Sequence, residues 1–235
     1  MEYLNNFIDG TIAGSTAAFV SHPFLVIKNT AQNGYEINYK KHINVKWLYS
    51  GLLRAMCSYS VEKMIVFGVY NSLRQHNYDP AIAGGIAGLL ASFSIAPGEQ
   101  LTIDKQLGVK NVKLNNIFGS LSHLYQGLTA TIFRESLGFM IHFSVYNYLT
   151  EKFNKEKSEI KTIMCGTSAV IFGWGSITPI DRIKTQIQSG TFNIKTYDFT
   201  KSFTGFRFAL LRAIPFHVTC FLVMEHLNGK KYEDI

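Results

Sequence analysis

The chain has 235 residues, 47% of them hydrophobic and 17% charged, and its formal net charge is +7. A mean hydropathy of +0.08 suits a soluble helical protein almost as well as a protein with several membrane spans, so composition alone does not decide the environment. Because the Lys and Arg residues are dispersed and form no basic run interleaved with aromatics, the sequence argues against nucleic-acid binding.

Hydrophobic periodicity predicts six long helices, over residues 6–32, 51–76, 80–107, 127–152, 160–188 and 206–229. Short amphipathic pieces are expected between the helices of each pair, near residues 37–47, 114–122 and 197–203. Each long helix could cross a bilayer, although no stretch of about 18 residues is uniformly apolar and uncharged. Since a charge at the bilayer centre costs roughly 2.5–3.5 kcal/mol, the charged side chains should face a shared, water-filled interior. This pattern predicts an all-α membrane transporter, with a basic soluble helical binding protein as the remote alternative.

Three proline-led segments repeat along the chain. They read PFLVIKNTAQ, PGEQLTIDKQ and PIDRIKTQIQ and begin at Pro23, Pro97 and Pro179. Their spacing of roughly 80 residues is the size of a whole supersecondary unit, and each proline should kink the first helix of its unit. We therefore expect one transmembrane domain, 1–235, of three helix–connector–helix repeats. The repeats run over about 1–77, 78–155 and 156–235.

Residues that support catalysis or metal binding do not occur in any recognisable spacing. Cys57, Cys165 and Cys220 are isolated within apolar stretches, without the paired spacing of a zinc site or a disulfide framework. No nucleophile elbow, phosphate-binding loop or dinucleotide fingerprint is present. We therefore expect no enzymatic activity, no metal and no cofactor.

The third proline-led segment has an acid and a base at fixed positions after its proline, namely Pro179, Asp181 and Lys184. With this signature and three segments in register, nearly the whole chain resembles the mitochondrial carrier family. The resemblance implies a monomer with six transmembrane helices around a pseudo-threefold axis and a central cavity, working by alternating access. It also implies the mitochondrial inner membrane, cytosolic termini, a small anionic or zwitterionic substrate, and membrane lipid, including cardiolipin, as a partner.

The charged positions of the three segments are incomplete, because Leu25 replaces the first acid and Thr102 replaces the second base. Two acids and two bases remain, namely Glu99, Asp181, Lys28 and Lys184. If each acid paired within its own repeat, or with the preceding repeat, charges would be left alone. Pairing each acid with the base of the next repeat leaves none alone, and that is also the direction of pairing in the family.

This rule predicts two ion pairs, Glu99–Lys184 and Asp181–Lys28. The resemblance implies that they form a gate on the matrix side, braced by hydrogen bonds from three glutamines. The glutamines are Gln32, Gln106 and Gln188. Breaking one partner of a buried pair costs about 3–5 kcal/mol, whereas replacing both partners can be nearly neutral, so the two missing charges compensate each other.

A second gate is implied at the cytosolic mouth, near the ends of the second helices of the repeats. One acid and one base survive there, Glu225 and Arg74, and the next-repeat rule joins them. Tyr70 and Tyr146 hold the aromatic positions of the first two repeats. With one charged pair here against two on the matrix side, we expect a weak cytosolic gate and a less favoured state closed to the cytosol.

Substrate contacts are implied on the second helix of each repeat, between the two gates, at Ser58, Arg134 and Arg212. Further candidate contacts on these helices are Glu62, Glu135 and His142. Two arginines can clamp phosphate or carboxylate oxygens through bidentate hydrogen bonds, so the solute should carry an anionic group. Three structural alternatives stay open: Arg134 could pair locally with Glu135, Arg54 could face lipid headgroups, and His142 could be a buried core histidine.

Two resemblances predict different classes of transported solute. The Arg134–Glu135 dipeptide resembles the contact pair of amino-acid carriers and favours an amine-bearing solute, such as a basic amino acid. The short chain, rich in Asn, Ile, Lys and Tyr, resembles family members encoded by giant viruses, which are associated with nucleotide and deoxynucleotide transport in the host mitochondrion. Because the net charge of the cavity is positive, the sequence is interpreted as that of a nucleotide exchanger, with amino-acid transport as the alternative.

Overall fold

The computed structural model describes residues 2–32, 44–106, 117–153, 159–194, 197–198, 202–203 and 206–233. Within these ranges the chain forms helices and turns, with no strand. All six predicted long helices are present: α1 (Glu2–Gln32), α4 (Leu52–Gln75), α5 (Pro80–Gln106), α7 (Leu128–Phe153), α8 (Glu159–Ser176) continued by α9 (Thr178–Gln188), and α10 (Phe206–Glu233). The predicted all-α fold is therefore confirmed.

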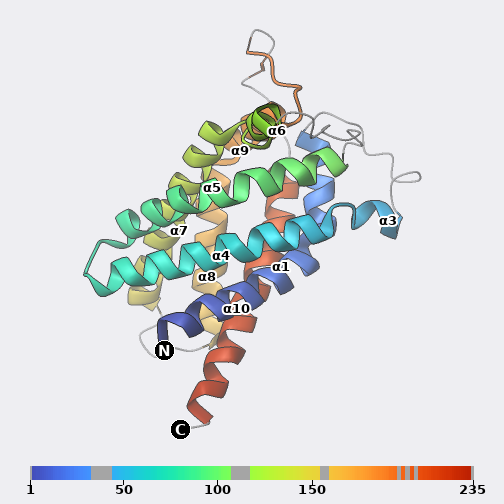
Figure 1. The fold of residues 1–235 in the computed structure, drawn as a ribbon. Coiled ribbons are helices and arrows are strands. Elements are labelled where there is room, and N and C mark those ends of the chain that lie inside the picture. The colour runs from blue at the N-terminus through green and yellow to red at the C-terminus, as the bar shows by residue number, and fades with distance from the viewer. Residues whose placement is uncertain are drawn as a thin grey trace.

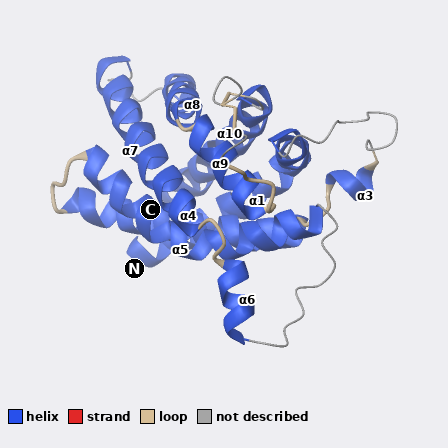
Figure 2. Ribbon diagram, turned by 90° about the horizontal axis from the view of Figure 1, so that it is seen from above, coloured by secondary structure: helices blue, strands red, loops and turns tan. Residues whose placement is uncertain are grey.

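The long helices form a closed ring in chain order. Each packs against the next one, and α10 packs against both α8 and α1, which closes the ring (Figure 1). The N- and C-termini and the α4–α5 turn lie at one end, here called the terminal end. The short helices α3 (Val45–Leu48) and α6 (Ile117–Leu124), together with α9, lie at the opposite end, here called the connector end. In Figure 2, α6 projects away from the long helices at this end.

The short amphipathic pieces are only partly as predicted. Helix α6 matches the piece expected near 114–122, and α3 overlaps the end of the piece expected near 37–47, of which 37–43 lie outside the described residues. The prediction for 197–203 is wrong at its described positions, 197–198 and 202–203, which are not helical. Single-turn helices are marginal without packing, and Tyr197 instead packs its ring on Phe192 and under the Arg182 guanidinium.

Glycines open the second helix of two repeats in a conformation that other residues adopt only with strain. Gly51 has φ +82° and Gly127 has φ +77°, and they directly precede α4 and α7. Both lie in the left-handed region, where a Cβ atom is disfavoured. In these two repeats the glycine therefore sets the turn by which the chain enters the second helix.

Helices α5 and α7 approach each other closely through two glycines one turn apart. A Cβ atom on Gly84 would lie 2.6 Å from the backbone oxygen of Phe139, and one on Gly88 would lie 2.4 Å from the backbone oxygen of Glu135. Small residues at such spacing let two helix backbones touch. This contact fixes where α7 presents its charged side chains to the interior.

The three proline-led segments do not share one backbone form. In the first two repeats, helices α1 and α5 continue through Pro23 and Pro97. In the third repeat the first helix breaks at Ile177, where α8 and α9 meet at 60°. Pro179 lies in the first turn of α9. Backbone N–H groups in a first turn have no acceptor within the helix, so a proline there costs no helical hydrogen bond. The third segment is thus a separate helix, which the periodicity did not predict.

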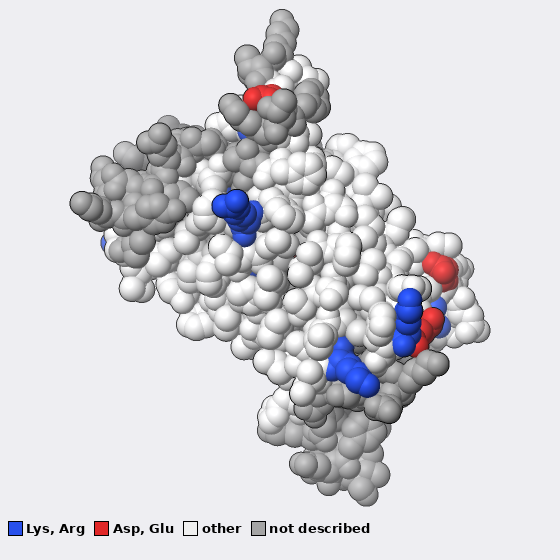
Figure 3. All heavy atoms as spheres, turned by 180° about the vertical axis from the view of Figure 1, so that it is seen from behind, with Lys and Arg blue, Asp and Glu red and all other residues white. Residues whose placement is uncertain are grey.

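The outer surface of the ring is apolar. Residues 8–31 of α1 and 80–105 of α5 are long and apolar enough to cross a membrane, and α8 with α9 qualifies as a third, bent span. Helices α4, α7 and α10 fall short because they carry the charged residues of the interior. Figure 3 shows charged side chains toward two ends of one face, with a band of uncharged surface between them.

Candidate functional site

Four charged side chains from three helices meet inside the ring toward the connector end. Lys28 Nζ on α1 lies 2.6 Å from Asp181 Oδ2 on α9, and Lys184 Nζ on α9 lies 2.6 Å from Glu99 Oε2 on α5. All four are largely buried, with side chains between 3% and 11% exposed. These are the contacts that the next-repeat rule predicts, and we call them the two gate pairs. Their role as a gate stays a prediction.

Arg134 on α7 joins the two gate pairs. Its Nη2 lies 3.0 Å from Glu99 Oε2 and its Nη1 lies 3.2 Å from Asp181 Oδ1, while Nη2 also contacts the carboxylate of the neighbouring Glu135. The predicted substrate contact is therefore part of the charged cluster, and its local pairing with Glu135 is also present. The sequence did not indicate this bridge, because the proline-led segments supply no residue from α7.

A small cavity lies beside the gate pairs, where a third acid–base pair would stand if Leu25 and Thr102 were charged. Leu25 and Thr102 both line it, together with Glu99 and Lys184. Leu25 is 5% exposed and Thr102 is 3% exposed, so neither position could hold a lone charge cheaply. Ser58 also lines this cavity, and its hydroxyl donates to the backbone oxygen of Arg54.

Arg212 on α10 lies beside one gate pair, because it lines a small pocket together with Lys28 and Asp181. Its guanidinium stands 5.8 Å from the ring centroid of Tyr59 and 5.7 Å from that of Phe216. Among the described residues no carboxylate lies within ion-pair distance of it, and its buried Nε has no hydrogen-bond partner. Glu135 Oε2 is likewise buried without a partner there. Both residues line one pocket, here called the charged pocket.

Two adjacent residues of α4 contribute a further ion pair to the charged pocket. Lys63 Nζ donates to Glu62 Oε1 at 2.7 Å. The same ammonium group stands 4.8 Å from the ring centroid of Phe139 and 5.2 Å from that of Phe216. Glu62 is thus brought into the interior as predicted, and Lys63 marks the boundary with the next cavity.

A second cavity of about 250 Å³ lies between the charged pocket and the terminal end. Aromatic side chains dominate its wall, so we call it the aromatic chamber; among them are Tyr70, Phe139, His142, Phe143 and Tyr146. Tyr70 and Phe143 stack with ring centroids 3.8 Å apart. His142 is 5% exposed and packs edge-on against Phe143. Tyr70 and Tyr146, assigned by sequence to the cytosolic gate, therefore line a cavity in this conformation.

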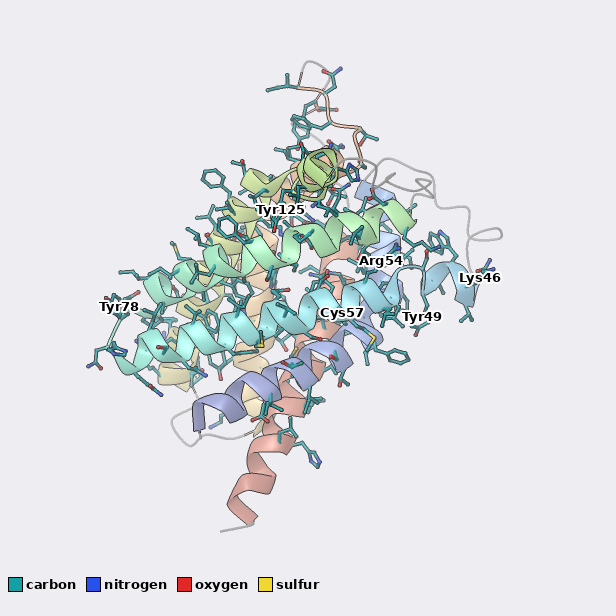
Figure 4. The ribbon with its side chains drawn as sticks, in the orientation of Figure 1. Lys46, Tyr49, Arg54, Cys57, Tyr78 and Tyr125 are labelled. Carbon is teal, nitrogen blue, oxygen red and sulfur yellow. The ribbon has the colours of Figure 1, made fainter. Side chains whose placement is uncertain are left out.

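The charged residues at the terminal end are placed only in part. Arg74 Nη1 donates to the backbone oxygen of Tyr78 at 2.6 Å, in the α4–α5 turn, where Figure 4 labels Tyr78. The side chain of its predicted partner Glu225 lies outside the described residues, as do those of Gln32 and Gln106. The Arg74–Glu225 pair therefore stays a prediction.

A polar cluster at the connector end was not predicted. Gln100 Nε2 donates to the backbone oxygen of Gln188 at 2.9 Å and to Asp104 Oδ1 at 3.1 Å. His123 Nε2 on α6 lies 2.9 Å from Asp104 Oδ2. The buried amide of Gln188, expected to brace the gate pairs, has no hydrogen-bond partner among the described residues. The i, i+4 spacing of Gln100 and Asp104 was the available signal for this cluster.

The entrance to α4 carries a basic side chain at the connector end. Arg54 Nη1 donates to the backbone oxygen of Leu101 at 3.2 Å, which ties α4 to α5. In Figure 4, Arg54, Tyr49 and Lys46 lie together at this end, opposite to Tyr78. In the part of the chain that the structure describes, no group of three His, Cys, Asp or Glu residues could hold a metal ion.

Comparison with known proteins finds no matching family model, but several curated proteins align over most of the chain. The mitochondrial carnitine carrier of Saccharomyces cerevisiae is 26% identical, over 98% of this chain and 89% of its own length. Mitochondrial ornithine transporter 1 of the same yeast is 23% identical, over 95% and 94%. The mitochondrial basic amino acids transporter of Homo sapiens is 26% identical, over 78% and 71%. The predicted resemblance to mitochondrial carriers is thereby confirmed.

Proposed function

We propose that this chain, a relative of the mitochondrial carriers, moves a small solute that bears both a carboxylate and a positively charged nitrogen. The chain is a solute carrier and a multi-pass protein of the mitochondrial inner membrane, as its relatives and its apolar helices indicate. The three relatives above are named for carnitine, ornithine and basic amino acids. These solutes all combine an amine or ammonium group with a carboxylate, and that shared chemistry guides the finer proposal.

One observation carries the proposal: the charged pocket contains a buried donor and a buried acceptor that are both unsatisfied among the described residues. The donor is Arg212 Nε and the acceptor is Glu135 Oε2. An unpaired buried polar group costs about 1–3 kcal/mol. A solute with a carboxylate for Arg212 and a protonated amine for Glu135 would satisfy both at once. A purely anionic solute would leave Glu135 unsatisfied and would be repelled by it.

The same geometry suggests how binding is coupled to opening of the connector end. Arg134 contacts Glu135 and both gate acids, Glu99 and Asp181. An amine that takes over Glu135 removes one of the partners that hold Arg134 in this position. Solute binding would then favour the state in which the gate pairs separate, because it interacts differently with the two states.

Nucleotide transport is the second candidate, and a specific feature favours it. The Arg212 guanidinium lies over the rings of Tyr59 and Phe216. The ammonium group of Lys63, on α4, also stands over the Phe216 ring. Cations next to aromatic faces can hold phosphates and a base together. None of the three relatives described above is named for a nucleotide, so this candidate rests on the pocket alone.

Transport by the purified chain in liposomes tests the proposal. Labelled ornithine, lysine, carnitine, ATP and dATP are offered outside, and the internal solute is varied to distinguish exchange from uniport. We expect uptake of at least one amine-bearing carboxylate and little uptake of nucleotides. Arg212→Gln should lower kcat/KM by about tenfold or more, because a charge-assisted hydrogen bond is worth about 1.5–3 kcal/mol. Arg54→Gln, at the connector end, is the matched control. Uptake restricted to nucleotides would refute the proposal.

A further inference from the structure

The aromatic chamber has no role in the proposed contacts of the solute's charged groups. It offers about 250 Å³ of space inside the ring. Its wall is formed by side chains such as Val66, Tyr70, Phe139 and Phe143, which are apolar or aromatic. Val66 is fully buried and Phe139 is 2% exposed, so these residues face the interior and not lipid. An apolar cavity at this depth is suited to an apolar group of a ligand.

The chamber and the charged pocket are neighbours with a shared boundary. Lys63 and His217 line both of them. His217 is held by the indole N–H of Trp174, which lies 3.1 Å from its Nε2, and Lys63 is held by Glu62 at 2.7 Å. Because the charged pocket offers only about 10 Å³ in this conformation, a solute whose charged groups bind there must displace these two side chains, and its remaining part then extends into the chamber.

The charge distribution indicates which kind of group the chamber accepts. Among the described residues that line it, none carries a carboxylate. The one cation on its wall, Lys63, is already paired with Glu62, so an ammonium group placed in the chamber would lose its hydration without gaining a counter-charge. An apolar tail gains free energy wherever it packs on the wall, because its surface is removed from water. An uncharged apolar tail fits better than a cationic one.

We propose that the transported solute is an amino carboxylate with an uncharged apolar tail, and that the aromatic chamber binds this tail. The inference rests on the proposed function, since the charged pocket must hold the carboxylate and the amine for the tail to reach the chamber. It makes Val66 and Phe143 residues that set the preferred length of the tail.

The test measures binding as the thermal stabilisation of the purified full-length chain by a homologous series. The probes are the straight-chain compounds 2-aminobutyrate, norvaline, norleucine, 2-aminoheptanoate and 2-aminooctanoate. We expect the concentration for half-maximal stabilisation to fall about fourfold for each added methylene until the chamber is full, and then to stop falling. Lysine, which carries an ammonium group on a tail of comparable length, should bind more weakly than norleucine.

Three variants locate the effect in the chamber. Val66→Phe fills it and should shorten the tail length at which binding stops improving. Phe143→Ala enlarges it and should lengthen that limit. Val61→Phe, the same substitution at a position 41% exposed on the outer side of α4, is the matched control and should leave the limit unchanged.

The outcomes separate this inference from the proposed function. No gain with tail length, a limit that stays the same in both chamber variants, or tighter binding of lysine than of norleucine would overturn the inference. If straight-chain carboxylates without the amine bound equally well and with the same length dependence, the amine contact would be wrong while the tail site stood. Stabilisation by nucleotides alone would overturn both.

Discussion

At the connector end, charged side chains of α1, α5 and α9 pair across the ring and Arg134 ties the pairs together. At the terminal end, the described side chains include no comparable pair between repeats, and aromatic rings such as Tyr70 and Phe143 line an open chamber. Separating a buried, hydrogen-bonded ion pair leaves two uncompensated charges. Aromatic side chains can change their packing without exposing a charge. We therefore expect that opening the connector end costs more free energy than opening the terminal end.

Removing one partner of a gate pair is expected to have the largest effect. Asp181→Asn leaves Lys28 buried without its counter-charge, which costs about 3–5 kcal/mol. We expect a lower thermal stability of the purified protein and transport reduced by at least an order of magnitude. The reversed pair, Lys28→Asp with Asp181→Lys, should recover a large part of both losses. If the double variant were no better than either single one, the pair would not act as a unit.

Forcing α5 and α7 apart should have the next largest effect. Gly88→Ala would place a Cβ atom 2.4 Å from a backbone oxygen, and such overpacking costs about 1–3 kcal/mol. Because α7 carries Arg134, both stability and transport should fall. The control is Gly85→Ala, whose nearest neighbour is the flexible end of Met140 at 3.1 Å. Equal melting temperatures for the two variants would contradict the close packing.

A third ion pair can be introduced where the charges are missing. Leu25→Asp or Thr102→Lys alone should destabilise the protein, because each buries an unpaired charge. The double variant should recover about 0.5–3 kcal/mol of coupling and, by strengthening the connector end, turn over more slowly than the parent. A double-mutant cycle on the melting temperature and on uptake measures this coupling. Strictly additive losses would show that the two positions do not meet.

The smallest effect is expected at the terminal end. Arg74→Glu or Glu225→Arg should change stability by about 0–1 kcal/mol, since partly exposed pairs contribute little. Transport should fall modestly in each single variant and return in the charge-swapped double variant. A double variant that transported no better than either single one would disprove the pairing, and a large rescue would show that the two ends are more alike than the comparison above suggests.

The gate pairs were predictable from the number and positions of the charged residues in the proline-led segments. Four charged residues at fixed positions can be paired without remainder in only one direction, and the structure has Glu99 with Lys184 and Asp181 with Lys28. The long helices were predictable apart from the break at Ile177, because hydrophobic runs are local signals.

The remaining features depend on how side chains from distant segments meet. Arg134 reaches the gate acids only because Gly88 lets α7 approach α5 closely, and no spacing in the sequence encodes that distance. The aromatic chamber combines rings from α4 and α7 with His217 of α10. The unpartnered atoms of Arg212 and Glu135 are likewise visible only in three dimensions.

The break at Ile177 makes the three repeats mechanically unequal. Tilting a continuous helix such as α1 or α5 at its proline strains a hydrogen-bonded backbone on both sides, whereas α8 and α9 already meet at 60° as separate helices. Asp181 and Lys184, one member of each gate pair, both ride on α9. We therefore expect that a displacement of this eleven-residue helix would separate both pairs together.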